Sequence, residues 1–186
     1  KTEVYGIRMS SPLDKITGVR IEVLPDPVWG GQLSPCAGGK FALTEFEVFR
    51  RVKGGALERV VMGAAEATHS QGDQPISNVI DGKAETPWGI HPRGKEAQTA
   101  MVLPRVPVKG IKDELLLIRI RQESKDPGRL MGRFRISVTD FESPELTAPL
   151  IESPPIQLPP LTPRLLGNTV LGKGKKERLV PMGEPA

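Results

Sequence analysis

Glycine and proline interrupt this chain too often for long helices to form. Together they make up 39 of its 186 residues, about 21 per cent, where an average chain has about 12 per cent. Proline ends helices and glycine weakens them, so the composition argues against a helical bundle. The sequence also lacks a run of about 18 to 20 apolar residues, the length that a membrane helix needs. We therefore expect no membrane span.

The distribution of the prolines divides the chain into two parts. Ten of the 19 prolines fall in residues 1–142, and nine fall in the last 44 residues. The second part contains Pro-Pro pairs and P-x-x-P spacings, which favour extended polyproline conformation. We predict a folded module over residues 1–142 and a Pro-rich extended C-terminal tail over residues 143–186. This tail is interpreted as a linker, or as an arm that docks on the module or on a neighbouring domain.

Short segments of alternating apolar and polar residues recur in the module. In residues 16–24, valine and isoleucine alternate with arginine and glutamate, which is the period of two of a half-buried strand. The pattern of residues 41–49 changes phase at Thr44-Glu45, which predicts a bulge or a bend. Further strands are predicted at residues 58–64, 97–103, 114–122 and 132–139. Such strands, separated by Gly and Pro clusters, indicate an all-β sandwich.

Charge and cysteine content exclude several classes of function. The net charge is +4, but the 26 basic residues are interleaved with 22 acidic ones. A short basic run at residues 173–178 lacks the base-reading residues of a nucleic-acid module, so we expect no nucleic-acid partner. The single cysteine, Cys36, excludes an internal disulfide framework, and no C-x-x-C-H haem attachment motif is present. The chain begins without Met or an apolar signal segment and is interpreted as a piece, or a processed form, of a larger protein.

The segment from Asn78 to Trp88 carries the most specific pattern. Asp81-Gly82 predicts a tight turn, and a carboxylate, a hydroxyl and several carbonyls lie within a dozen residues of it. Calcium takes six to eight oxygen ligands of these kinds. From the residues alone two interpretations stay open. The segment is either an Asx-type turn with Trp88 filling the core, or a calcium-binding loop.

This segment resembles a known family. The pattern N-x-x-D-G-x-x-x-T-x-W, preceded by A-T-x-S-Q, is similar to the signature of discoidin or coagulation-factor type C domains, the galactose-binding-like jelly-roll sandwiches. The segments G-V-R-I-E-V and T-E-F-E-V-F resemble strands that close such domains, but here they precede the Asp81 loop. The chain therefore resembles a circularly permuted member. A module of this kind is found in large exported proteins of planctomycetes, beside a cytochrome c domain.

The resemblance implies a structural calcium ion and names its ligands. They would be two carboxylates and four neutral oxygens: the side chains of Asp81 and Glu45, the carbonyls of Thr44, Asn78 and Lys83, and the hydroxyl of Thr86. The ion would link the loop to a strand and stabilise the fold without taking part in catalysis.

The resemblance also implies a sugar-binding surface on loops, with an aromatic platform and polar side chains. The candidates in this chain are Trp29, His69, Gln71, His91 and Arg93. Trp29 lies in a Gly/Pro-rich loop, and its sequence context leaves open whether it is exposed or packed beneath the loop. Two histidines without a third ligand are a weak metal or catalytic signal. No G-x-S-x-G or H-E-x-x-H motif is present, and we expect no catalysis.

These observations lead to two functional hypotheses. The first is a non-catalytic carbohydrate-binding module of a larger exported protein, periplasmic or extracellular, which binds a polysaccharide or glycan and is stabilised by calcium. The alternative is a structural module that packs against neighbouring domains or subunits of a redox complex without binding sugar. Exposure of Trp29 favours the first, whereas burial by the tail or by another chain favours the second.

Overall fold

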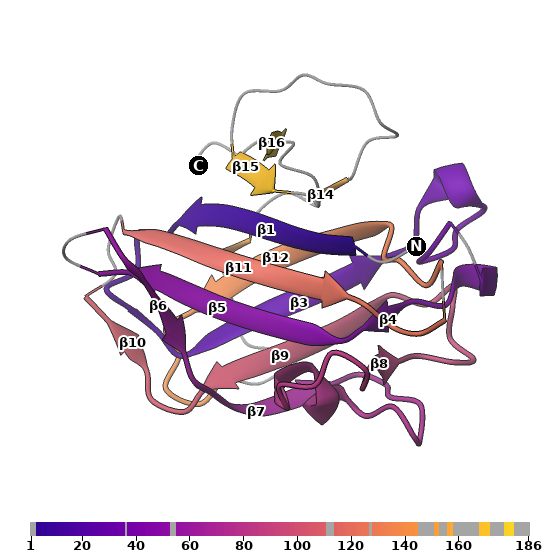
Figure 1. Ribbon diagram of the computed structural model, residues 1–186, viewed down its shortest axis with the longest axis horizontal. Coiled ribbons are helices and arrows are strands. Elements are labelled where there is room, and N and C mark those ends of the chain that lie inside the picture. Colours follow the sequence, from indigo (N-terminus) through magenta and orange to yellow (C-terminus); the bar gives the residue numbers. More distant parts are fainter. Residues whose placement is uncertain are drawn as a thin grey trace.

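Figure 1 shows a computed structural model of the chain. It describes residues 3–35, 37–52, 55–110, 114–126 and 128–144, and the backbone of four short segments, 151–152, 156–157, 168–171 and 177–180. Its elements are mostly β-strands, joined by turns and short 3-10 helices. The all-β class predicted from the Gly and Pro content and the strand pattern is confirmed.

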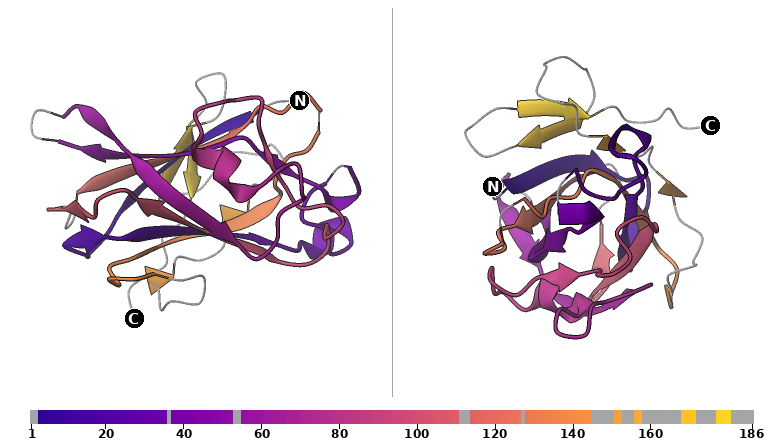
Figure 2. Two further views of the ribbon diagram at one scale, coloured as in Figure 1. Left: turned by 90° about the horizontal axis from the view of Figure 1, so that it is seen from below. Right: turned by 90° about the vertical axis from the view of Figure 1, so that its right-hand side faces the viewer.

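Two antiparallel sheets face each other and form a β-sandwich (Figures 1 and 2). The first sheet contains, in spatial order, β16 (Glu177–Val180), β15 (Asn168–Leu171), β1 (Glu3–Ser10), β11 (Leu115–Gln122), β5 (Glu45–Arg51) and β6 (Leu57–Val60). The second contains β12 (Arg133–Thr139), β3 (Gly18–Leu24), β9 (Gln98–Pro104) and β7 (Met62–Ala67), with β13 (Ile151–Glu152) and β14 (Ile156–Gln157) both paired to β12. Among the described strands, the chain passes from the first sheet to the second between β1 and β3, between β6 and β7, and between β11 and β12.

Smaller elements close the ends of the sandwich. Two short pairs lie outside the large sheets: β2 (Lys15–Ile16) with β10 (Val108–Lys109), and β4 (Ala42–Leu43) with β8 (Trp88–Gly89). The 3-10 helices are η1 (Pro27–Trp29), η2 (Ala37–Gly39) and η3 (Ile76–Ile80). Helix η3 contacts both β5 and β7, so it lies beside the place where the two sheets meet.

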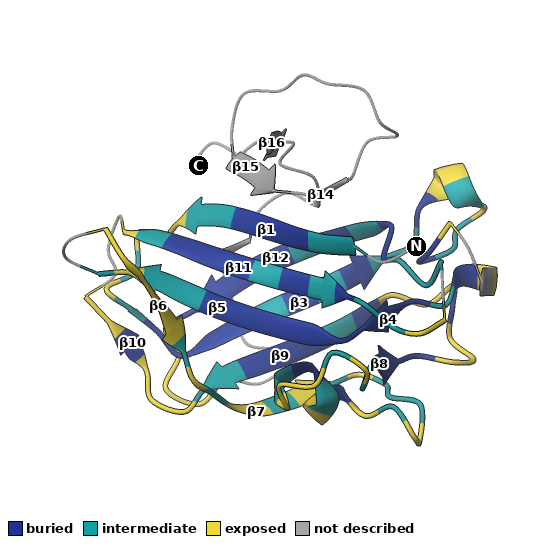
Figure 3. Cartoon of the chain, viewed as in Figure 1, coloured by how far each residue is buried: buried dark blue, intermediate teal, exposed yellow. Residues whose placement is uncertain are grey.

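The core lies between the sheets and is built by alternation. Val19, Ile21 and Val23 of β3 are buried, whereas the intervening Arg20 and Glu22 are only half-buried on the outer face. In β11 and β12 the alternation holds over part of each strand, whereas the first four residues of β5, Glu45 to Val48, are all buried (Figure 3). The alternation observed in the sequence therefore reflects inward and outward side chains.

The predicted bend at Thr44 is present. The chain leaves β4 at Leu43 and begins β5 at Glu45, and the Thr44 N–H and hydroxyl both donate to the Arg121 carbonyl, at 2.8 and 3.0 Å. After this break Phe46 joins the hydrophobic core, whereas Glu45, which is also buried, lies 4.0 Å from the Arg59 guanidinium. The bend thus determines where the Glu45 carboxylate lies.

The strands predicted at residues 97–103, 114–122 and 132–139 occur within one residue of their expected bounds. The single strand predicted at residues 58–64 is wrong, because the chain breaks there into β6 and β7, which belong to different sheets. Strand β1 was not predicted. It pairs with β11 over its whole length, from Glu3 opposite Gln122 to Ser10 opposite Leu115. In the tail, the described strands are short and add to the edges of both sheets, on β12 and on β1. Edge positions suit a Pro-rich segment, because proline has no N–H to donate to a second neighbouring strand. The rest of the predicted arm lies outside the described residues.

Candidate functional site

The Asp81 loop draws several oxygen atoms together. The Lys83 N–H donates to Asp81 Oδ1 at 2.8 Å, which is the predicted Asx-type turn, and Gly82 adopts a φ of 80° within it. The hydroxyl of Thr86 lies 2.8 Å from Asp81 Oδ2 and 2.9 Å from the Lys83 carbonyl. A hydroxyl has one proton and can donate it to only one of these oxygens. The Thr86 hydroxyl therefore bridges the Asp81 carboxylate and the Lys83 carbonyl.

Helix η3 and Trp88 hold this loop on the sandwich. Ile76 and Val79 of η3 are buried, and the Asn78 side-chain amide donates to the Pro87 carbonyl at 3.0 Å. The Asp81 N–H donates to the Asn78 carbonyl at 3.4 Å, so this carbonyl faces the same turn. Trp88 is fully buried, as predicted. Both ends of the loop are thus anchored in the core.

Glu45 lies close to this loop and is the least satisfied side chain of the site. It is 3 % exposed, and neither of its carboxylate oxygens has a hydrogen-bond partner. Burial, followed by the charges of Asp81 and Glu47, raises the pKa of Glu45 to about 7, although Arg59 and Arg121 act in the opposite direction. Buried polar groups in proteins are nearly always hydrogen-bonded or bound to an ion. A divalent cation can stabilise a buried carboxylate that lacks hydrogen bonds and lies near a second carboxylate.

The residues that the resemblance names for calcium are oxygen donors. The structure brings together the Asp81 carboxylate, the Thr86 hydroxyl and the carbonyls of Lys83 and Asn78, and Glu45 lies close enough to feel the charge of Asp81. Such an all-oxygen set suits a hard cation. Among the described residues no group of three His, Cys, Asp or Glu side chains could hold a metal ion. Backbone and hydroxyl oxygens would therefore have to complete the coordination.

The candidate sugar-binding residues come from loops that are hydrogen-bonded to one another. His69 Nε2 lies 3.2 Å from the His91 carbonyl, and the Gln71 N–H donates to the Gly89 carbonyl at 2.8 Å. The Gln71 side chain bonds to Asp73, and Arg93 forms an exposed ion pair with Glu96 at 3.4 Å. His69, Gln71 and the His91 backbone are therefore brought together.

Trp29 belongs to a third loop of this group. A backbone hydrogen bond of 3.0 Å from Leu33 to Gly94 links its loop to that of Arg93. The side chain is half-buried, and its ring lies against the backbone of Gly132, where an added Cβ atom would clash with Trp29 Cζ3. Trp29 is therefore positioned by its own module, and part of its side chain stays exposed to solvent.

Gly132→Ala is expected to displace the Trp29 ring. The added methyl group meets the six-membered part of the indole, so the loop must move, at a cost of about 1–3 kcal/mol. Urea unfolding would measure this loss, and tryptophan fluorescence would report the move of Trp29 into water. Gly72→Ala is the control, since nothing lies within 4 Å of its added Cβ. Equal stability of the two variants would contradict the packing of Trp29 on Gly132.

No family model, curated protein or solved structure matches the chain. Within the described residues, no helix is long and apolar enough to cross a membrane.

Sequence reasoning missed the charged side chains around Glu45. Glu47, which is 7 % exposed, pairs with Arg119 at 3.3 Å and with Arg59 at 3.6 Å. These residues lie on the neighbouring strands β5, β11 and β6. Only the alternation of side chains along each strand indicated that they could lie on the same face of the sheet.

Proposed function

We propose that this chain is a non-catalytic, calcium-stabilised β-sandwich module that binds carbohydrate. Its fold would be the permuted, galactose-binding-like jelly roll of the resemblance. The observation that supports calcium is the Glu45 carboxylate, which is buried without a hydrogen bond beside the oxygen-rich Asp81 loop. Glu45 and Asp81 would hold the ion with the Thr86 hydroxyl and the carbonyls of Thr44, Asn78 and Lys83. The ion supplies positive charge that links the loop to β5.

Carbohydrate binding is proposed for the loops that carry Trp29, His69, Gln71, His91 and Arg93. The proposal is supported by the half-buried indole of Trp29, which packs on the backbone of Gly132. The loop of Trp29 is also hydrogen-bonded to the loops that carry the polar candidates. An aromatic face packs on the apolar face of a sugar, while side-chain amides, imidazoles and guanidinium groups bond to its hydroxyls. In a larger exported protein such a module would raise the local concentration of polysaccharide near a neighbouring domain.

A calcium titration tests the metal half of this proposal. Calcium at ten times its Kd is expected to add about 1.4 kcal/mol to the free energy of unfolding, which raises Tm by a few degrees. Asp81→Asn should remove this response, since it takes a charge from the site and disturbs the turn to Lys83. Asp73→Asn is a matched control on an exposed loop. A Tm that neither calcium nor a chelator changes would overturn the calcium site.

A glycan array tests the carbohydrate half. Retention of the full chain on a polysaccharide, lost in Trp29→Ala but kept in Val28→Ala, would support the loop surface. Val28 is the adjacent residue and is 75 % exposed, so its truncation controls for loss of general apolar surface. Binding to no polysaccharide would favour the alternative, a structural module that packs on neighbouring domains or subunits.

A further inference from the structure

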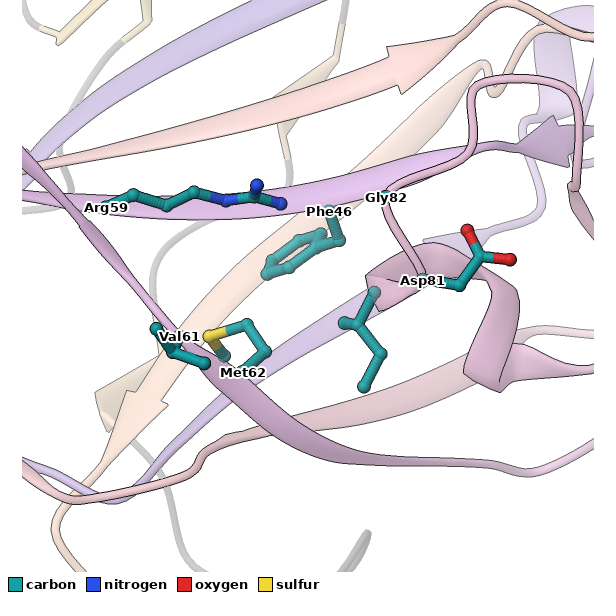
Figure 4. Close-up of a pocket in the computed structure, with 7 residues that line it drawn as sticks. Phe46, Arg59, Val61, Met62, Asp81 and Gly82 are labelled. Carbon is teal, nitrogen blue, oxygen red and sulfur yellow. The ribbon is translucent and has the colours of Figure 1, made fainter.

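An open pocket lies beside the candidate calcium site, away from the loops of Trp29 and His91. It has a volume of about 220 Å³ and is lined by Phe46, Arg59, Val61, Met62, Ile80, Asp81 and Gly82. Figure 4 shows the apolar side chains between Arg59 on one side and Asp81 on the other. Pockets for drug-sized ligands measure about 300–1,000 Å³, so this one accommodates a single small ring.

Arg59 is the cation nearest to the unsatisfied carboxylate. Its guanidinium lies 4.0 Å from Glu45 and 3.6 Å from Glu47, and its side chain is 52 % exposed. Both contacts are longer than a hydrogen bond, and Glu47 has a closer partner in Arg119, at 3.3 Å. Arg59 is therefore weakly held and can leave these carboxylates when another cation replaces it.

Calcium would make the charge around this pocket more positive. Glu45 and Glu47 lie within 4.0 Å of Arg59, and Asp81 lines the pocket. A bound divalent ion would add two positive charges beside these carboxylates and free Arg59 from Glu45.

We infer that the pocket binds a carboxylate-bearing sugar residue, a uronate, only when calcium is present. The Arg59 guanidinium would receive the carboxylate, since its fork of N–H donors matches that group. The apolar side chains of Met62 and Ile80 would contact the C–H face of the ring. This inference rests on the proposed calcium site, but it assigns a ligand and a place that the loop surface does not include.

Calorimetric titration of the full chain with digalacturonate tests the inference, with neutral galactobiose as the comparison. With calcium, digalacturonate should bind at least ten times more tightly than galactobiose, and a chelator should abolish this preference. Arg59→Gln should weaken digalacturonate binding at least tenfold while keeping the calcium-induced rise in Tm. Arg50→Gln is the matched control, because Arg50 lies on the adjacent strand and pairs with Glu58 at 2.8 Å.

The outcomes separate this inference from the calcium site. A calcium-induced rise in Tm without digalacturonate binding, or with binding that Arg59→Gln leaves unchanged, would overturn the pocket and leave the calcium site standing. Binding that persists in chelator would overturn the calcium dependence. If calcium changes neither Tm nor binding, the calcium site and the pocket inference both fail.

Discussion

Glu45→Gln is expected to make the calcium-free protein more stable above pH 7 and to abolish its response to calcium. The native state holds the Glu45 carboxyl with a pKa near 7, against 4.5 for an ordinary glutamate. Between these values the native state retains a proton that the unfolded chain has lost, so stability falls as pH rises through this range. The shift corresponds to at most about 3 kcal/mol. Glutamine has no charge to bury and escapes this loss.

Urea unfolding in chelator, at pH 4.5 and pH 8, measures this effect. The two proteins should differ little at pH 4.5, and the variant should be the more stable at pH 8. Glu47→Gln is a matched control two residues along the same face, with similar burial, but its carboxylate is paired with Arg119 and Arg59. It should lose stability instead, because its partners lose their counter-ion. A Glu45→Gln variant that is less stable than the wild type at both pH values would contradict the prediction.

The same titration predicts how calcium and pH interact. Calcium requires the ionised carboxylate, so its binding must compete with the proton below pH 7. The calcium-induced rise in Tm should therefore grow between pH 5 and pH 8 in the wild type. It should be absent at every pH in Glu45→Gln, which separates loss of the ligand from a general change in stability.

The strands could be predicted from the sequence where alternation was long and bounded by turns. Residues 16–24 and 132–139 met both conditions and became neighbours in one sheet. Strand β1 was overlooked although Tyr5 and Ile7 are buried on its inner face, because Gly6 and the chain start obscured the pattern. The phase change at Thr44 was informative, since a residue out of phase marks the place where the strand breaks.

The candidate site was partly accessible from the sequence. The Asp81 turn follows from local chemistry, because Asp, Gly and Thr at this spacing bond to one another's backbone. The proximity of Glu45 to Asp81 joins positions 36 residues apart, and only the family resemblance indicated it. The missing hydrogen bonds of Glu45 could not be predicted, since they depend on the side chains of adjacent strands. The packing of Trp29 on Gly132 likewise could not be predicted, because the two residues lie far apart in the sequence and no pattern links them.

Trp88→Ala is expected to cause the largest loss of stability, about 3–5 kcal/mol. Trp88 is fully buried, packs edge-on against Phe41 with ring centroids 5.2 Å apart, and donates its indole N–H to the His69 carbonyl at 3.0 Å. The truncation opens a cavity and leaves this carbonyl unpaired. Because Trp88 directly follows the Asp81 loop and also holds the loop of His69, its loss should weaken both candidate sites together.

Two further variants divide this loss into its causes. Trp88→Phe keeps most of the buried ring but removes the indole N–H, so it should cost about 1–3 kcal/mol for the unsatisfied carbonyl. Trp29→Ala truncates a half-buried tryptophan of the same size and should cost less than Trp88→Ala. If the three variants unfold in urea with the same m-value, their midpoint concentrations rank their free energies of unfolding. If Trp88→Ala costs no more than Trp29→Ala, Trp88 does not anchor the loop. A larger loss for Trp88→Ala, accompanied by faster amide exchange at Gln71 and Lys83, would indicate that one buried side chain holds both loops in place.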